Sequence, residues 1–325
     1  MWTTADLETL FLPGPTSLTI GAFDGVHRGH QALIRRLVES ARAAGRHSVV
    51  VTFDPLPLQY FGRAEEVLLS SVEERVAYLR PLGVDGVVVL PFDAAMANTT
   101  AADFVTLMLQ HLHMVELWVG PDFALGRGRE GNARRLRQMG KKRGFTVHQM
   151  PPFRWRDEVV HSTRIRELLR AGNVQLANAL LGRPYRLTGA LAERNHREYA
   201  AGVPTLIFRP PAARLQPGPG VYVGQIQWEA ERHETLVYIR RLPSERKEML
   251  LQPLYGSKAL RGCGARLDLL AHLRPLALPT SFPANLVRLR EDRRAAQRWL
   301  EQRALPLARG TSGEAAVKTG SEEDR

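Results

Sequence analysis

Helix and strand patterns alternate along the first 181 residues of this chain and then give way, from about Arg186, to short β-rich runs. Residues 49–53 (VVVTF) form a short, continuous apolar run, which is typical of a strand buried on both faces. Strands and helices that alternate in this way predict crossover connections, a parallel sheet and helices on both faces of it. We therefore expect a doubly wound α/β domain over residues 1–184.

The apolar periodicity and the capping residues place the elements of this domain. Strands are expected at residues 17–23, 49–53, 84–90, 115–119 and 145–150, and helices at 31–44, 72–81, 100–112, 134–143, 162–170 and 174–181. Ser71 and Glu74 have the spacing of a capping box, and Thr100 is a candidate cap. Ligands of such sheets bind beyond the carboxyl ends of the strands, so the loops after Phe23, Phe53 and Val119 are the places to search, together with the loop after Leu90.

The second part of the chain lacks helical periodicity until its end. Its β-rich runs are separated by Pro and Gly and cover residues 186–191, 204–209, 221–228, 235–240, 249–255 and 267–273. This pattern indicates an antiparallel barrel or sandwich. We expect a smaller β domain over residues 185–305, closed by a helix near 284–302. Residues 306–325 are expected to be a disordered, dispensable tail.

Composition excludes several classes of protein. With 44% hydrophobic residues the chain can build sizeable cores, which excludes a disordered protein. A single cysteine excludes both an intramolecular disulfide framework and a cysteine-based zinc site. The first residues lack the pattern of a signal peptide, and no apolar run approaches the ~20 residues of a membrane-spanning helix. We expect a cytoplasmic protein with no membrane contact.

The formal net charge of +12 has three interpretations: nucleic-acid binding, an arginine-rich proteome, or small substrates rich in phosphate. Much of the charge lies in residues 126–144 and 288–303. Neither stretch has the interleaved aromatic residues of a surface on which bases stack. This argues against a nucleic-acid partner and leaves the other two interpretations, which are compatible with each other.

Residues 21–30 (GAFDGVHRGH) carry the strongest chemical signal, because they follow a predicted strand and open a predicted helix. His27 and His30 are three residues apart and so share one face of the helix start. There the free backbone N–H groups and the positive end of the helix dipole suit a polyphosphate, and Gly25 and Gly29 let the backbone approach it. The alternative is an ordinary strand–turn–helix corner with incidental histidines.

Residues 161–166 (HSTRIR) carry the second signal. Ser162 or Thr163 is expected to cap a helix, and Arg164 and Arg166 offer charge for leaving phosphates. Residues 126–131 match the pattern G-x-G-x-x-G, but they follow the fourth predicted strand, and no acidic residue lies ~20 positions further on. We interpret them as a flexible basic loop over a phosphate ligand.

Together the two motifs resemble the HxGH nucleotidyltransferase superfamily. Further short motifs occur in the order and spacing of the bacterial FAD synthetases, at residues 52–55, 120–123, 131–132, 162–166 and 181–185. These enzymes are bifunctional riboflavin kinases and FMN adenylyltransferases. The resemblance covers residues 15–305, and its specific motifs lie within 18–189. It implies an α/β adenylyltransferase domain followed by a riboflavin kinase β-barrel, with Mg²⁺ as cofactor and with ATP, FMN and riboflavin as substrates.

The resemblance also implies roles for individual residues. His27 and His30 would contact the ATP phosphates, and Arg164 and Arg166 would neutralise the departing pyrophosphate. Candidate flavin or nucleotide contacts are Gly21, Phe23, Asp24, Gly25, Gly29, Asp122, Phe123, Asn132, Ser162 and Thr163. The chain departs from the family at Leu56, where a histidine is usual, at Ala124-Leu125, where Arg-Phe is usual, and at His161, where a serine is usual.

The kinase half departs further from the family pattern. Thr205 persists as a candidate metal ligand and Glu248 matches a catalytic glutamate, but Ile207 replaces an asparagine and Glu198 replaces a glycine. An alkyl side chain offers Mg²⁺ no oxygen, and a carboxylate repels a triphosphate. From the sequence we expect weak or absent riboflavin kinase activity, with the barrel retained for flavin binding or domain packing.

Two rival functions remain at this stage. One is a different HxGH transferase that acts on another phosphate or nucleotide. The other is a non-catalytic flavin- or RNA-binding protein that uses the basic loop at residues 126–131. The oligomeric state is not determined by any of these patterns.

Overall fold

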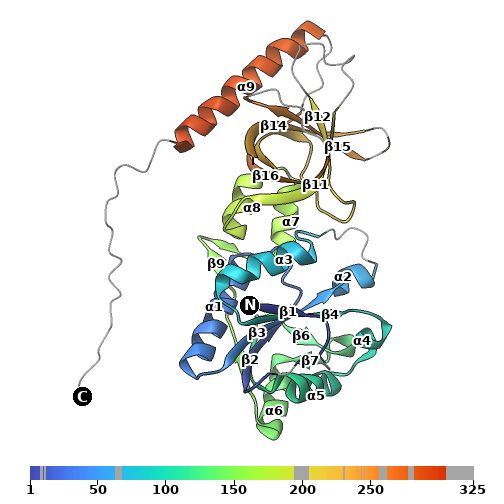
Figure 1. The fold of residues 1–325 in the computed structure, drawn as a ribbon, viewed down its shortest axis with the longest axis vertical. Coiled ribbons are helices and arrows are strands. Elements are labelled where there is room, and N and C mark those ends of the chain that lie inside the picture. Colours follow the sequence, from blue (N-terminus) through green and yellow to red (C-terminus); the bar gives the residue numbers. More distant parts are fainter. Residues whose placement is uncertain are drawn as a thin grey trace, which may run out of the picture. The chain divides into compact units, whose positions relative to one another are not determined.

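The computed structural model describes residues 1–7, 10, 12–62, 68–193, 205–229, 231–242, 244, 246–255, 262–276 and 282–304. The chain forms two compact units, Met1–Ala277 and Leu278–Arg325. The first unit contains a parallel sheet with its helices and a closed β-barrel, and the second contains α9 (Phe282–Ala304) (Figure 1). Among the residues described, no helix combines the length and the apolar character that crossing a membrane requires.

Six parallel strands form the sheet, in the order β1-β4-β3-β2-β5-β8. Their bounds are Trp2–Thr4 (β1), Thr16–Ile20 (β2), His47–Asp54 (β3), Gly86–Pro91 (β4), Met114–Val119 (β5) and Thr146–Gln149 (β8). The chain winds outward from β2 through β3 and β4 on one side, and through β5 and β8 on the other. The predicted doubly wound sheet is confirmed, and its order reverses between β2 and β5.

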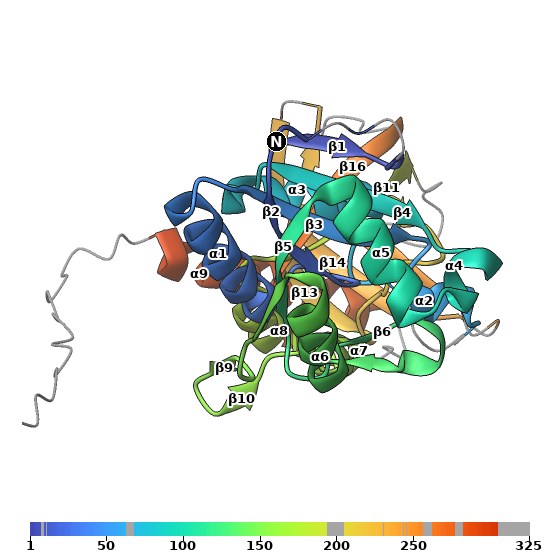
Figure 2. The ribbon, with the colours of Figure 1, turned by 90° about the horizontal axis from the view of Figure 1, so that it is seen from below.

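Helices pack on both faces of this sheet (Figure 2). Val50 of β3 packs in one apolar cluster with α1 (Arg28–Ala43) and α3 (Val72–Leu79). Val49 and Val51 point the other way, into a cluster with α5 (Ala101–Leu112) and α6 (Ala133–Arg143). The alternation explains why residues 49–53 read as a continuous apolar run. The predicted caps of α3 and α5 are confirmed: Ser71 forms a capping box with Glu74, and the Thr100 side chain accepts from the Asp103 N–H.

Several short elements in the loops were not predicted. They are α2 (Pro57–Tyr60), η1 (Arg80–Leu82), α4 (Ala94–Asn98), β6 (Ala124–Leu125), η2 (Arg127–Arg129), β7 (Gly131–Asn132), β9 (Arg154–Trp155) and β10 (Glu158–Val159). The predicted bounds of α7 (Ser162–Arg170) and α8 (Val174–Leu181) are confirmed. Residues 126–131, which we expect from the sequence to be a flexible basic loop, lie instead in a small hairpin in which Ala124 pairs with Asn132.

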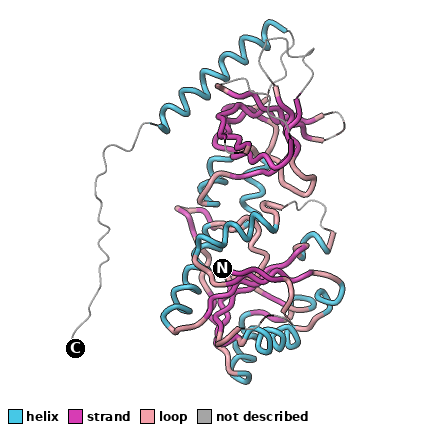
Figure 3. The backbone as a smooth tube through the Cα atoms, viewed as in Figure 1, coloured by secondary structure: helices cyan, strands magenta, loops and turns pink. Residues whose placement is uncertain are grey.

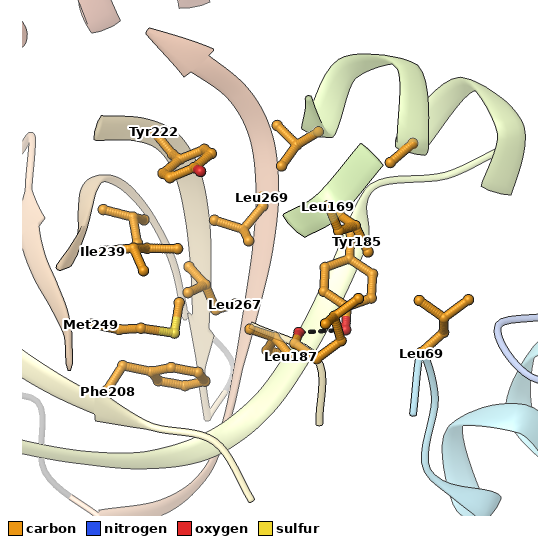
Figure 4. Packing of buried hydrophobic residues seen from close by; sticks show 14 of the residues in the cluster. Leu69, Leu169, Tyr185, Leu187, Phe208, Tyr222, Ile239, Met249, Leu267 and Leu269 are labelled. Atoms are coloured by element: carbon orange, nitrogen blue, oxygen red, sulfur yellow. Dashed lines mark hydrogen bonds between the residues drawn. The ribbon is translucent and has the colours of Figure 1, made fainter. Parts of the chain in front are cut away.

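The β-rich part of the chain is a closed antiparallel barrel (Figure 3). Its strand order is β11-β12-β15-β14-β13-β16. Its strands are Tyr185–Glu193 (β11), Leu206–Arg209 (β12), Gly220–Trp228 (β13), Glu231–Arg241 (β14), Lys247–Pro253 (β15) and Gly262–Arg274 (β16). Phe208, Met249 and Leu267 fill its interior (Figure 4). Of the two predicted architectures, the barrel is the one observed.

The barrel and the α/β domain share one apolar core within the first unit. Leu69 and Leu169 belong to the same buried cluster as the barrel interior (Figure 4). Tyr185, at the start of β11, donates its hydroxyl hydrogen to the carbonyl of Leu215 at 2.7 Å. The domain boundary that we predict between residues 184 and 185 stays a prediction, and the tail at 306–325 lies outside the described residues.

Candidate active site

Two adjoining cavities lie at the carboxyl ends of β2 and β5, where the strand order reverses. The histidine cavity, of about 490 Å³, is lined by residues that include His27, Gly29, His30 and Ser162. The aromatic cavity, of about 500 Å³, is lined by residues that include Phe53, Phe92 and Phe104. Both cavities share Ile20, Gly21, Asp122 and Phe123. A crevice at the reversal point is the expected ligand site of an open parallel sheet.

His27 forms the N-cap of α1 in the histidine cavity. Its Nδ1 accepts from the backbone N–H of His30 at 3.3 Å, and the two imidazole rings are stacked with centroids 3.6 Å apart. An Nδ1 that accepts a hydrogen bond carries no proton, so the neutral ring of His27 has its proton on Nε2 and can donate from there. A Cβ on Gly29 would lie 3.2 Å from both His27 Nδ1 and the carbonyl oxygen of Val160, so glycine allows this close approach.

Both histidines are uncharged at neutral pH. Burial lowers the pKa of His27 well below its ordinary value, and a positive charge on the neighbouring His30 or His161 would lower it further. Burial, reinforced by the Arg75 guanidinium, lowers the pKa of His30 to about 3. His30 Nδ1 is buried and has no hydrogen-bond partner among the described residues. The cavity therefore presents neutral imidazoles to a ligand.

Asp24 belongs to the turn between β2 and α1, but it lines neither cavity. It is 1% exposed and accepts hydrogen bonds from the backbone N–H groups of Leu69 and Ser70, each at 3.0 Å. Arg166 Nη2 is paired with Asp24 Oδ2 at 2.6 Å, and Gly25 N–H donates to Ser70 Oγ at 2.8 Å. The structure thus places Asp24, Gly25 and Arg166 in a buried network that holds the turn between β2 and α1 against α7.

The predicted cap of α7 is wrong by one or two residues. His161, rather than Ser162 or Thr163, occupies the N-cap, and its Nδ1 accepts from the Arg164 N–H at 3.2 Å. Ser162 lines the histidine cavity and donates to the carbonyl of Asp24 at 3.1 Å, whereas Thr163 is exposed and lines neither cavity. The Arg164 side chain is paired with Glu158 at 3.0 Å and with Glu167 at 3.4 Å, and it also lines neither cavity.

The aromatic cavity is mainly apolar. Phe53 and Phe92 meet edge to face with centroids 5.6 Å apart, and Arg129 donates to the carbonyl of Asp122 at 2.9 Å on the polar side. The cavity lining includes Gly126, Gly128 and Arg129, so residues 126–131 border the aromatic cavity and not the histidine cavity. Asn132 lines neither cavity. It is the N-cap of α6, and its side chain accepts from the Arg135 N–H at 3.0 Å.

Sequence reasoning missed two residues of this region. Arg75 of α3 is 1% exposed and donates to Thr52 Oγ1 at 2.9 Å and to the Phe53 carbonyl at 2.8 Å. Its guanidinium thereby places a positive charge near His30, at the end of β3. An arginine at an inward position of a predicted amphipathic helix was the available signal. The second residue is His161, whose signal was its departure from the usual serine.

The kinase candidates of the barrel have partners in their own domain. Thr205 is 3% exposed, and its hydroxyl accepts from Gln252 Nε2 at 3.3 Å. Glu248 Oε2 accepts from Arg240 Nε at 2.7 Å, and Ile207 lies half-buried in β12. Glu198 falls on residues 194–204, which lie outside the described part of the chain.

Two family models match successive parts of this chain. The family model of FAD synthetase matches residues 12–164, and that of riboflavin kinase matches residues 181–300. The bifunctional riboflavin kinase/FMN adenylyltransferase of Escherichia coli (strain K12) is 36% identical over 211 residues, which cover 64% of this chain and 67% of that protein. The enzyme of the same name from Haemophilus influenzae is 35% identical over 213 residues, covering 65% of this chain and 69% of that protein.

A solved structure supports the fold. The crystal structure of a protein described as a macrolide-efflux protein, from Streptococcus pneumoniae, superposes with a TM-score of 0.81 and covers 91% of this chain and 98% of its own. At 23% identity it is evidence for the fold alone. The matched relatives and family models confirm the resemblance inferred from residues 15–305. This chain belongs to the bifunctional riboflavin kinase/FMN adenylyltransferase family.

Proposed function

We propose that this protein makes FAD from FMN and ATP in its α/β domain and makes FMN from riboflavin and ATP in its barrel. The observation that carries the first activity is the pair of adjoining cavities, one lined by neutral histidines and one by aromatic rings. Such a pair fits a reaction that joins a nucleotide to a planar, apolar ring system. The two family models over successive parts of the chain support both activities.

The chemistry of the two cavities assigns one substrate to each. The phosphates of ATP would lie in the histidine cavity, beside the N-terminus of α1 and the imidazoles of His27 and His30. The flavin ring of FMN would lie in the aromatic cavity, among Phe53, Phe92 and Phe104. The two phosphates would then meet along the shared residues Gly21 and Asp122.

In the reaction, a phosphate oxygen of FMN forms a bond to the α-phosphorus of ATP while the bond from that phosphorus to pyrophosphate breaks. A phosphate monoester is already ionised at neutral pH, so the attacking group needs no general base. Catalysis consists of positioning and of stabilising the charge that develops on the phosphates. We assign this stabilisation to His27 and His30, which donate hydrogen bonds as neutral imidazoles. Asp24 and Arg166 hold the turn that positions them.

Mg²⁺ fits this proposal as an ion that binds together with the nucleotide phosphates. Among the residues that the structure describes, no group of three or more His, Cys, Asp or Glu side chains gathers as a metal site. Mg²⁺ commonly enters active sites on substrate phosphates with few protein ligands, and this requires no such group. When bound there, it would neutralise charge on the phosphate oxygens. The single cysteine and the small-molecule substrates support a cytoplasmic location.

Product analysis tests the proposal directly. The purified protein is incubated with ATP and Mg²⁺ and with either FMN or riboflavin, and liquid chromatography follows FMN, FAD and pyrophosphate. FAD from FMN is the expected product of the α/β domain, and FMN from riboflavin that of the barrel. Turnover of other phosphorylated acceptors with no FAD would favour another HxGH transferase. Copurifying nucleic acid without any turnover would favour an RNA-binding protein.

A further inference from the structure

We propose that His161 binds the phosphates of the nucleotide, as a third histidine of the site. The serine that is usual at this position in the family could not make the same contact. The proposal rests on the FMN adenylyltransferase function and adds a substrate-binding residue particular to this chain. His161 lines the histidine cavity together with His27, His30 and Ser162. Its side chain is exposed, so a ligand in the cavity can reach it.

The starts of two helices meet at this place. The Cβ position of Gly29, in the first turn of α1, lies 3.2 Å from the carbonyl oxygen of Val160, the residue before His161. Ser162, the first residue of α7, donates to the carbonyl of Asp24 at 3.1 Å. The free N–H groups and positive dipole ends of α1 and α7 therefore border one cavity, and each of these helices has a histidine as its N-cap.

The two caps have the same hydrogen-bond pattern. His27 Nδ1 accepts from the N–H of His30, and His161 Nδ1 accepts from the N–H of Arg164 at 3.2 Å. Because Nδ1 is an acceptor in both rings, the proton of each neutral imidazole is on Nε2. Capping therefore leaves each ring with one outward donor. Phosphate oxygens accept from such donors, and a hydrogen bond to a charged group is stronger than one between neutral groups.

Capping alone does not account for a histidine at this position. Serine is among the best N-cap residues and would satisfy the same N–H group. A serine that caps uses its hydroxyl oxygen in doing so, and its side chain is short. The imidazole caps with one nitrogen and extends the other outward. The neighbouring cation, Arg164, is paired with Glu158 and Glu167, so we assign the phosphate contact to His161.

The decisive variant is His161→Ser, which keeps a cap on α7 and removes the outward donor. We expect KM for ATP and the inhibition constant of pyrophosphate to rise by about tenfold, as loss of one such hydrogen bond implies. We expect the KM for FMN and the melting temperature to stay unchanged. Calorimetric titration of the full chain with ATP and Mg²⁺ measures the same loss without requiring turnover. His111→Ser, in the last turn of α5 and lining neither cavity, is the matched control.

His161→Ala separates binding from capping, because it removes both. We expect it to match His161→Ser in ATP affinity and to melt at a lower temperature, since α7 loses its cap. An ATP affinity of His161→Ser within twofold of the wild type would overturn the proposal. So would a loss of affinity confined to His161→Ala, which would make His161 a cap only. A wild type that binds ATP but never forms FAD would instead refute the proposed function.

Discussion

The two catalytic regions of this chain differ in where their candidate residues stand. In the α/β domain, His27 and His30 lie at a helix start beyond the end of a strand, and they face a cavity. In the barrel, Glu248 lies within β15 and is paired with Arg240. Thr205 directly precedes β12 and is hydrogen-bonded to Gln252. A loop at the end of a parallel strand presents backbone N–H groups to a ligand, whereas a strand in a closed barrel uses its backbone groups in the ladder.

The difference shows which kind of substitution each region tolerates. The α/β site that we propose would depend on backbone positions, on the buried Asp24 carboxylate and on the two neutral imidazoles. In the barrel site that we propose, individual oxygen ligands would hold Mg²⁺, and the resemblance places Ile207 where an asparagine would supply one of them. The riboflavin kinase match over residues 181–300 supports kinase activity, so we expect the substitution to lower its rate and not to abolish it.

The largest expected effect tests whether the two regions are energetically independent. Arg214 is 4% exposed, pairs with Glu74 of α3 and donates to the carbonyl of Leu69 at 2.8 Å. Arg214→Met would leave the largely buried Glu74 carboxylate without its cationic partner, with the Ser71 N–H and the Thr188 hydroxyl as its remaining donors, so we expect stability to fall by roughly 3 kcal/mol. Denaturant unfolding at pH 7 measures the loss.

The double variant Glu74→Gln/Arg214→Met provides the control for this pair. It leaves no buried, unpaired charge, so its loss of stability should be clearly smaller than that of Arg214→Met. If the two substitutions simply add, the ion pair contributes nothing to the link between the domains.

The second prediction concerns His30, the residue expected to act in only one region. His30→Ala should lower kcat for FAD formation by on the order of 10²-fold, equal to ~2.7 kcal/mol, because a preorganised donor to the phosphates is lost. The melting temperature and the riboflavin kinase rate should stay close to those of the wild type. Steady-state assays of both reactions on one preparation measure this, and an unchanged FAD rate would exclude the histidine pair from the mechanism.

The third prediction concerns the barrel. In the wild type we expect riboflavin to be converted roughly tenfold more slowly than FMN, equal to ~1.4 kcal/mol of barrier, because Ile207 offers Mg²⁺ no oxygen. Ile207→Asn should raise the kinase rate and leave FAD synthesis unchanged. The measurement is chromatography of each reaction under identical ATP and Mg²⁺. Equal rates in the wild type would remove the contrast between the two regions.

The smallest expected effect is the change in stability between pH 7 and pH 5.5. The pKa of His30 falls to about 3 on folding, from an ordinary value near 6.5, so below pH 6.5 the unfolded chain binds a proton that the folded chain does not. Stability is therefore present in full above pH 6.5 and is lost as the pH falls towards 3, by at most ~1.4 kcal/mol per pH unit for one site. His30→Asn should lose less between pH 7 and 5.5 than the wild type.

His272 of the barrel offers the matched comparison for that experiment. Partial burial also lowers its pKa, but less strongly than that of His30. His272→Asn should therefore change the pH slope less than His30→Asn does. Denaturant unfolding at the two pH values measures both slopes, and equal slopes for the wild type and His30→Asn would show that His30 keeps its ordinary pKa in the folded chain.

Local chemistry in the sequence determined most elements of the fold. The capping box of Ser71 and Glu74 started α3 as predicted, and the bounds of α7 and α8 were correct, because neighbouring residues decide capping and helical periodicity. β1 was missed, because its three residues are too few to show a pattern and exist as a strand only through pairing with β4. The cap of α7 was misplaced, because His161, Ser162 and Thr163 can all accept an N–H.

The sequence by itself determined that two histidines start a helix after a buried strand, and this predicts a phosphate site. Only the tertiary structure decided which charges face that site. Arg166 forms an ion pair with Asp24, 142 residues away in the sequence, and neither residue lines the cavity. Arg75 of α3 lies near His30, and His161 at the start of α7 lies near His27. The physical reason is that local propensity acts over a few residues. The position of a charge beside a cavity instead depends on how the strands are ordered and which helix starts meet at their ends.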